Sequence, residues 1–315
     1  MIIGIDTSCY TTSLAVIEKT TEEILFDRRR LLQIKLGERG LRQSEAVFQH
    51  LKNLPELLNM DTGLQVSLVS AAVSPRPVAG SYLPVFKVGE SFGESIAGLL
   101  GVPFLSTSHQ EGHIRAGLTG YQGQMTQTFL AWHVSGGTTE LLKVAPKDFG
   151  YDITKIGGST DLQVGQFIDR VGVALGGGFP AGVFLEKLAL QSFTSETLPV
   201  VTKDLTVSFS GPASAAERLI KSGADQPEIA KKVFNCIAKS LFKVTMEAIN
   251  RFQINQVLIV GGVASNQLIR EFLLNNGSSE EIEFIFGAKE LSSDNAVGVG
   301  LIGFDYYRTL EESNE

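Results

Sequence analysis

The chain has 315 residues, of which 43% are apolar and 19% are charged, so it is neither fibrous nor disordered and is long enough for about two domains. Its 27 Lys and Arg against 34 Asp and Glu give a formal charge of −7, which argues against a protein coated in nucleic acid but leaves room for a local basic patch. The two cysteines, Cys9 and Cys236, lie far apart, so we expect neither a disulfide framework nor a cysteine-based zinc site.

The N-terminal residues carry no export or membrane signal. They lack a basic start and a cleavage site, and no apolar run in the chain reaches the roughly 18 residues that a membrane helix needs. Together with the sparse cysteines, this indicates a cytoplasmic protein that does not span a membrane.

Apolar runs alternate with amphipathic stretches along the chain, which predicts an α/β protein rather than a helical bundle or a β-sandwich. We expect strands at 2–6, 12–18, 66–73, 127–134, 139–144, 256–260 and 282–286. We expect helices at 44–60, 84–100, 108–118, 163–175, 182–192, 226–252, 264–275 and 294–311.

A weak internal repeat in the sequence suggests a duplicated architecture. Gly4–Ser8 is followed by Thr12–Val16, and about 130 residues later Val134–Thr138 is followed by Glu140–Val144. Each pair is typical of a strand, a small polar turn and a second strand. Two such hairpins, each opening half of the chain, predict duplicated lobes with a ligand cleft between them, whereas the alternative is two unrelated hairpins.

Two histidines in the predicted helix 108–118 form half of a candidate metal site. His109 and His113 stand at i and i+4, so on a helix both imidazoles lie on one face and can reach a single ion. Glu111 is the third residue of this motif rather than the second, so the motif is not the HExxH of a zinc peptidase. The alternative interpretation is a pair of partly exposed surface histidines.

An aspartate at the start of the last predicted helix could complete this site. Asp294 follows Ser292 and Ser293, and such a residue is by default a helix N-cap. A carboxylate combined with two imidazoles, however, leaves open coordination positions, which is typical of a catalytic metal site.

Two Gly-Gly turns follow predicted buried strands. Gly261-Gly262 follows the strand 256–260 and leads into a predicted helix, and Gly136-Gly137 follows the strand 127–134. A glycine turn at a helix start lets backbone N–H groups approach an anion or a purine closely, although an ordinary strand-to-helix connection has the same pattern. The two turns together favour a nucleotide bound between lobes, as in actin-like and sugar-kinase-like folds.

A basic run lies between residues 27 and 42. It holds six Arg and Lys residues against two acidic residues, a local charge of +4 on an acidic chain. Such runs bind phosphates in some proteins, but the composition slightly favours a solvated face.

Taken together, these motifs resemble the TsaD-type tRNA threonylcarbamoyladenosine synthases, some of which were formerly called O-sialoglycoprotein endopeptidases. The resemblance spans nearly the whole chain and matches in order and spacing. The segments that match the family motifs are residues 4–9, 109–113, 134–139, 165–169, 179–182, 208–211, 261–266 and 294–296.

The resemblance implies an actin-like, hexokinase-like (ASKHA) duplicated two-lobed fold with a ligand cleft between the lobes. The expected lobes are 1–125, completed by the C-terminal helix 297–315, and 126–296. The implied activity is the transfer of a threonylcarbamoyl group from threonylcarbamoyl-AMP to N6 of adenosine 37 in tRNAs that read codons beginning with A. The implied partners are tRNA, an adenine nucleotide (threonylcarbamoyl-AMP, ATP, ADP or AMP) and a protein of the modification complex bound through the N-terminal lobe.

The resemblance also carries site residues onto matching positions. One divalent ion, Fe or Zn, is implied at His109, His113 and Asp294. The active loop corresponds to Ser8, Cys9, Tyr10 and Thr11. The residues implied to hold the nucleotide are Ser135, Gly136, Gly137, Thr138, Asp169, Gly182, Gly261, Gly262 and Asn266.

The sequence departs from the family pattern at several positions of the transfer site. The family usually has two acidic residues where this chain has Tyr10 and Thr11, and a neutral pair cannot supply that charge. This favours a divergent paralogue. The readings that stay open are a synthase, an impaired paralogue that scaffolds the modification complex, and a related metal- and nucleotide-dependent carbamoyl transferase acting on a small molecule.

Overall fold

The structure is a computed structural model that describes residues 1–34, 41–59, 63, 65–123, 125 and 127–313. It divides into two compact units. The first comprises Met1–Gln122, Ala145–Ile153 and Ser293–Glu315, and the second comprises Gly123–Val144 and Thr154–Ser292. Relative to the lobes expected from the sequence, residues 145–153 and 293–296 group with the first unit, whereas the second unit begins at Gly123 rather than at 126.

The first unit is built on a five-stranded sheet with the order β3-β2-β1-β4-β5. Its strands are β1 (Ile2–Thr7), β2 (Thr11–Ile17), β3 (Ile24–Leu31), β4 (Leu68–Ser74) and β5 (Phe104–Ser108). The first three pair antiparallel, whereas β4 runs parallel to β1 and β5 parallel to β4. The three strands predicted in this region are confirmed. The sequence missed β3, which carries three consecutive arginines, and β5, which is short and half polar.

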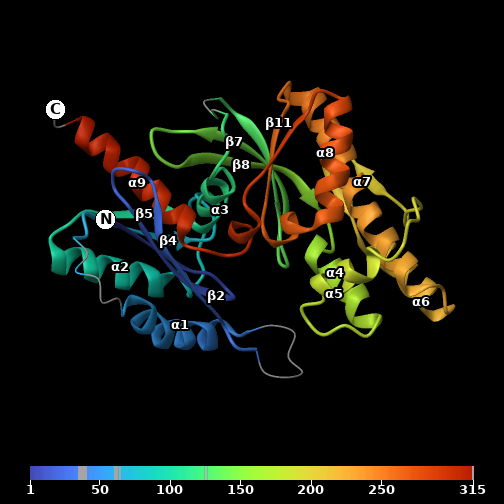
Figure 1. The fold of residues 1–315 in the computed structure, drawn as a ribbon, viewed down its shortest axis with the longest axis horizontal. Coiled ribbons are helices and arrows are strands. Elements are labelled where there is room, and N and C mark those ends of the chain that lie inside the picture. Colours follow the sequence, from blue (N-terminus) through green and yellow to red (C-terminus); the bar gives the residue numbers. More distant parts are fainter. Residues whose placement is uncertain (35–40, 60–62, 64, 124, 126, 314–315) are drawn as a thin grey trace. The chain divides into compact units, whose positions relative to one another are not determined.

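Helices cover both faces of this sheet, as Figure 1 shows for α1 and α2 on one side and α9 on the other. They are α1 (Gln43–Leu58), α2 (Phe86–Leu100), α3 (His109–Gly117) and α9 (Val297–Glu312). Ile3 and Ile5 of β1 pack in a core with side chains of α1 and α2. Because neighbouring residues of a strand point to opposite faces, Gly4 faces α9, where a Cβ would lie 2.5 Å from the nitrogen of Gly300. The missing side chain lets the last helix lie directly against the central strand.

The second unit is built on a seven-stranded sheet with the order β12-β11-β6-β7-β8-β10-β9, of which only the end of β7 and the start of β8, residues 145–146 and 151–153, group with the first unit. Its strands are β6 (Phe129–Val134), β7 (Thr139–Pro146), β8 (Tyr151–Ser159), β9 (Val201–Lys203), β10 (Thr206–Ser208), β11 (Gln256–Val260) and β12 (Glu283–Phe286). β6 and β7 form the predicted hairpin, and β11 runs parallel to both β6 and β12. The carboxyl ends of β6 and β11 therefore lie at the same edge of the sheet, which brings the two Gly-Gly turns together.

Five α-helices of the second unit are described: α4 (Val164–Ala174), α5 (Gly182–Ala189), α6 (Ser210–Lys221), α7 (Gln226–Phe252) and α8 (Gln267–Ser279). The helix predicted at 226–252 is confirmed at both ends as α7. At its start, the Asp225 side chain accepts a hydrogen bond from Glu228 N and caps the first turn. The helix expected at 264–275 begins later, at Gln267, because Gly262–Ser265 forms a 3₁₀ turn and Asn266 is the N-cap. Within the part of the chain that the structure describes, no helix is both long and apolar enough to cross a membrane.

Candidate functional site

Local sequence explains why α3 presents two histidines side by side. Ser108 and Glu111 form a reciprocal capping box at its start, with the Ser108 hydroxyl accepting from Glu111 N and the Glu111 carboxylate accepting from Ser108 N. The Glu111 carboxylate is therefore engaged in the N-terminal cap of α3. One turn of regular helix then separates His109 from His113, and their ring centroids lie 4.5 Å apart.

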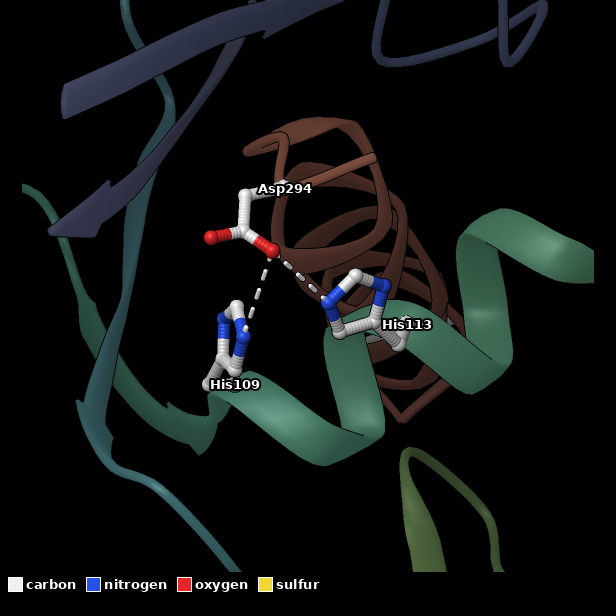
Figure 2. A group of neighbouring side chains, drawn as sticks. All are labelled: His109, His113 and Asp294. Atoms are coloured by element: carbon white, nitrogen blue, oxygen red, sulfur yellow. Dashed lines mark ion pairs between the residues drawn. The ribbon is translucent and has the colours of Figure 1, made fainter. Parts of the chain in front are cut away.

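Asp294 joins these two imidazoles, as Figure 2 shows. Its Oδ1 lies 3.3 Å from His113 Nε2 and 3.8 Å from His109 Nε2, and one ligand atom from each residue lies within 4.8 Å of the others. We call these three residues the ligand triad; all belong to the first unit. His113 is buried and His109 half-buried, so the alternative of two surface histidines is wrong. Asp294 is not a helix cap either, because α9 begins at Val297 rather than at 294.

Close contact between α3 and α9 places Asp294 beside the histidines. A Cβ on Gly298, in the first turn of α9, would overlap the carbonyl oxygen of Gly112, which lies between the two histidines on α3. Only glycine at this position lets the two helices meet backbone to backbone. Sequence reasoning missed this pair, although the run of glycines in the last helix was its signal.

Two residues of the first hairpin contact the ligand triad. Asp6 Oδ2 lies 2.6 Å from His109 Nδ1, and the Ser8 hydroxyl donates to Asp294 Oδ2 at 2.5 Å. Both are buried, with 1% and 2% of their surface exposed. Ser8 belongs to the expected active loop, whereas no role was expected for Asp6 from the sequence.

The charges of these groups depend on one another. Burial alone would lower the pKa of His109, but the carboxylates of Asp6 and Asp294 outweigh burial and raise this pKa to about 9. Burial alone would raise the pKa of Asp294, but the hydrogen bond from His113 and the charge of His109 hold it well below its usual range. The site therefore keeps negative charge on Asp294 and stabilises positive charge next to it.

The donor chemistry of the ligand triad fits a divalent cation. Two imidazole nitrogens and one carboxylate oxygen suit borderline metals such as Zn²⁺ or Fe²⁺ and leave coordination positions for a substrate or water. Asp6 Oδ1 is buried and has no hydrogen-bond partner among the residues described here, so the negative charge beside the triad is incompletely compensated. A cation at the triad would compensate that charge.

The other residues of the expected active loop differ in exposure. Tyr10 is 46% exposed, whereas Thr11 is only 4% exposed because it begins β2 and pairs with Leu31. The Cys9 thiol lies 3.7 Å from Gln43 Nε2, and burial raises its pKa, so it is not an activated thiolate. Burial also raises the pKa of Tyr10, so its phenol carries no charge at neutral pH.

The expected nucleotide residues all lie in the second unit. Ser135–Thr138 is the turn of the β6–β7 hairpin, closed by a 2.8 Å bond from Ser135 N to Thr138 O. Gly165 of α4 packs against this turn, where a Cβ would lie 2.5 Å from the Cα of Gly136. Gly261 has φ of 93° and lies against the carbonyl of Val134, so both Gly-Gly turns meet at one sheet edge.

The remaining three expected nucleotide residues are held by their own helices. Asp169 on α4 accepts a 2.7 Å hydrogen bond from Ala181 N, directly before Gly182 opens α5. Burial raises the pKa of Asp169. The Asn266 side-chain oxygen accepts from Ile269 N at 3.0 Å and caps α8, which leaves its amide nitrogen available to a ligand.

Three arginines of the basic run, Arg28, Arg29 and Arg30, make contacts within the protein. Arg28 donates to the carbonyl oxygens of Leu57 and Asn59 at 3.2 Å each, Arg29 pairs with Asp27, and Arg30 pairs with Glu56. Lys35, Glu38 and Arg39 lie outside the described residues. The described part of the run therefore supplies intramolecular contacts at the edge strand.

Comparisons of the sequence with known proteins give a consistent result. The family model of the tRNA N6-adenosine threonylcarbamoyltransferases (TsaD) matches residues 46–301. The protein of that name from a Sulfurihydrogenibium species is 32% identical, with 98% of this chain and 91% of the relative covered. The protein of that name from Thermosipho africanus is 27% identical over 98% of this chain and 94% of the relative.

Solved structures show the fold. Full-length HypF in its phosphate- and nucleotide-bound form superposes with a TM-score of 0.61 at 12% identity, and the match covers 98% of this chain but only 46% of HypF. The activator of 2-hydroxyisocaproyl-CoA dehydratase from Clostridium difficile, with bound ADPNP, gives a TM-score of 0.54 at 15% identity over 99% of this chain and 97% of the activator. The expectation of the actin-like (ASKHA) fold class is confirmed.

Proposed function

Because the chain belongs to the tRNA N6-adenosine threonylcarbamoyltransferase family, we propose that it transfers a threonylcarbamoyl group from threonylcarbamoyl-AMP to N6 of adenosine 37 in tRNAs that read codons beginning with A. Acyl transfer to tRNA is the activity that gives the family its name. The observation that supports the proposal for this chain is the ligand triad, because Asp294 is distant in sequence from His109 and His113 of α3 and yet one ligand atom of each residue lies within 4.8 Å of the others.

In the proposed reaction, the N6 amine attacks the carbamoyl carbon, a C–N bond forms, and the bond from that carbon to the phosphate oxygen of AMP breaks. AMP leaves with the electron pair of the broken bond, and N6 loses one proton to solvent. We assign His109, His113 and Asp294 to one Zn²⁺ or Fe²⁺, which when bound supplies a Lewis acid for the carbamoyl oxygen. The two Gly-Gly turns, Asp169, Gly182 and Asn266 are assigned to the adenylate, which they would hold as the leaving group.

The test is an assay with threonylcarbamoyl-AMP and unmodified tRNA, followed by mass spectrometry of the digested nucleosides. It is run with the protein alone and with the organism's other threonylcarbamoyl-modification proteins. We expect modified adenosine to appear and to be lost in the His109→Ala, His113→Ala double variant. Equal product from the double variant and the parent would contradict the role of the ligand triad.

One observation favours a second candidate, an impaired paralogue that serves as a nucleotide-binding scaffold. Tyr10 stands where the family usually carries a carboxylate, and its exposed phenol is neutral at neutral pH. The scaffold reading predicts binding of nucleotide without transfer, and a gain of activity by the main synthase when this protein is added. The same assay, repeated with that synthase, distinguishes the two.

A protein partner of the modification complex is proposed for the first unit. Phe48 and Leu51 of α1 and Leu99 and Leu100 of α2 are large apolar side chains with 48% to 87% of their surface exposed. Such exposed groups on neighbouring helices suit a helical partner surface. Replacing Phe48 and Leu51 by serine should abolish co-elution with the partner and leave the monomer folded.

A further inference from the structure

The end of β1 and the first residue after it contact two of the three members of the ligand triad, through Asp6 of the strand and Ser8 directly beyond it. Asp6 and Ser8 are separated by one residue, and in an extended chain such residues project to the same side. Asp6 meets His109 and Ser8 meets Asp294, although the two partners are 185 residues apart in the sequence (294 − 109).

The contact between Asp6 and His109 fixes which nitrogen of the ring faces the triad. A carboxylate oxygen at 2.6 Å from Nδ1 accepts a hydrogen bond, so Nδ1 carries the proton in this contact. Nε2 is then the nitrogen directed to Asp294, 3.8 Å from its Oδ1. In metal sites, a carboxylate behind a histidine orients the ring and increases its basicity as a ligand.

The contact between Ser8 and Asp294 gives the two carboxylate oxygens of Asp294 different partners. The Ser8 hydroxyl donates to Oδ2, whereas Oδ1 is the oxygen that faces both histidines in Figure 2. One oxygen is thereby held by the protein and the other is presented to the triad. Without the hydroxyl, the carboxylate could rotate about its last bond and lose this orientation.

A buried histidine holds the turn itself. His50 on α1 lies with Nε2 2.9 Å from the carbonyl oxygen of Ser8 and with Nδ1 2.8 Å from the Thr12 hydroxyl. The carbonyl can only accept, so Nε2 donates to it and the hydroxyl donates to Nδ1 of the neutral ring. Both sides of the turn are thus attached to the same helix, which keeps Asp6 and Ser8 in place.

We propose that Asp6 and Ser8 are positioning residues that hold His109 and Asp294 in the orientation that binds a divalent cation. This inference rests on the proposed metal site. It assigns to Asp6 a task that is independent of the substrates, so it can be tested by metal affinity without tRNA or nucleotide.

The experiment measures Zn²⁺ affinity by competition with a chelator, and the absorption spectrum of the Co²⁺-loaded protein, for the parent and for Asp6→Asn and Ser8→Ala. Each variant should bind Zn²⁺ about 10- to 100-fold more weakly, and the Co²⁺ spectrum should change because the ligand geometry changes. Ser13→Ala is the matched control, because Ser13 is equally buried in the same hairpin but donates only to the backbone oxygen of Asp6. It should retain the affinity of the parent.

A second measurement separates positioning from a general loss of structure. In a His109→Ala background, Asp6→Asn should no longer weaken Zn²⁺ binding, because Asp6 acts through the ring that has been removed. The same reduction in both backgrounds would overturn the positioning role of Asp6. A parent that binds neither cation would overturn the proposed metal site itself, whereas a parent that binds Zn²⁺ no better than Asp6→Asn and Ser8→Ala would overturn only the positioning role.

Discussion

Gly298 of α9 lies against the backbone of Gly112 of α3, so that a Cβ on Gly298 would overlap the Gly112 carbonyl oxygen. This contact determines how close the segment before α9 can approach the two histidines of α3. A backbone-to-backbone contact cannot be relieved by a side-chain rotation, so a larger residue must displace one of the helices.

The first prediction concerns this contact. Gly298→Ala should lower the free energy of unfolding by about 1–3 kcal/mol, as overpacking typically does, and should weaken Zn²⁺ binding because Asp294 moves with α9. Urea unfolding and a chelator competition measure the two effects. Gly98→Ala is the control, because Gly98 of α2 has no neighbour within 4 Å of the added Cβ and should be neutral or slightly stabilising. Unchanged metal affinity in Gly298→Ala would show that the helix contact does not position Asp294.

The second prediction concerns metal content. The His109→Ala, His113→Ala double variant should purify without the metal that the parent carries, because a single carboxylate cannot hold a transition metal in competition with buffer. Elemental analysis measures the ion, and far-ultraviolet circular dichroism checks that the variant is folded. Equal metal content in the two proteins would remove these residues from the metal site.

The third prediction separates ligand binding from helix capping at Asn266. Its oxygen caps α8, so Asn266→Ala should cost about 1 kcal/mol of stability, whereas Asn266→Ser keeps a capping oxygen and should cost much less. Both changes remove the amide nitrogen. If that nitrogen contacts the adenylate, calorimetry with ATP, ADP and AMP should give weaker binding for both variants. Weaker binding only in the alanine variant would mean that Asn266 acts through the helix alone.

Local pattern was sufficient to predict most helices and the central strands, because alternating or continuous apolar residues report burial directly. It failed for β3, whose arginines at an edge strand satisfy their charges with partners such as Glu56 and backbone carbonyls far along the chain. It also failed for α6, whose first half, Ser210–Ala216, is made of small residues without a marked apolar period. In both cases, contacts with residues distant in the sequence determine the secondary structure.

The histidine pair and Asp294 could be selected from the sequence because the i, i+4 spacing of a helix and the chemistry of a metal ligand are both recognised without knowledge of the fold. The roles of Asp6 and Gly298 could not, because each depends on a partner that is distant in the sequence and only the fold brings near. The i, i+2 spacing of Asp6, in β1, and Ser8, directly after it, is the pattern that would have indicated a shared role.

The fourth prediction is a pH dependence of stability that originates at His50. Burial lowers the pKa of His50, although the nearby charge of Asp6 opposes this shift. The unfolded chain then binds the proton first as pH falls below about 6.5, so the contribution of His50 is complete above that pH and is lost on acidification. The loss has a limiting slope of about 1.4 kcal/mol per pH unit.

Urea unfolding at pH 7.5 and 5.5, for the parent and for His50→Gln, measures this contribution. The variant should be less stable at pH 7.5 but should lose less stability between the two values, and subtracting the two proteins removes the other titrating groups. Parallel pH profiles would contradict a depressed His50 pKa.

The last prediction concerns the acidic charge missing from the expected active loop. If the family's carboxylate at position 10 orients or deprotonates the attacking amine, its absence here should leave the protein slow on tRNA, and restoring it should raise transfer by about 10²- to 10⁴-fold. The structure restricts the test to one residue. Tyr10 is 46% exposed and can be replaced, whereas a glutamate at Thr11, which is 4% exposed, would bury a charge inside the sheet.

Tyr10→Asp is therefore compared with Tyr10→Asn, which removes the same aromatic ring and adds no charge. A gain in the aspartate variant alone assigns the defect to the missing carboxylate. A similar gain in both variants would instead point to steric obstruction by the ring. Strong modification by the parent, comparable to a synthase with the acidic pair, would falsify the idea that Tyr10 impairs transfer, and the amine would then have to lose its proton without a carboxylate at position 10.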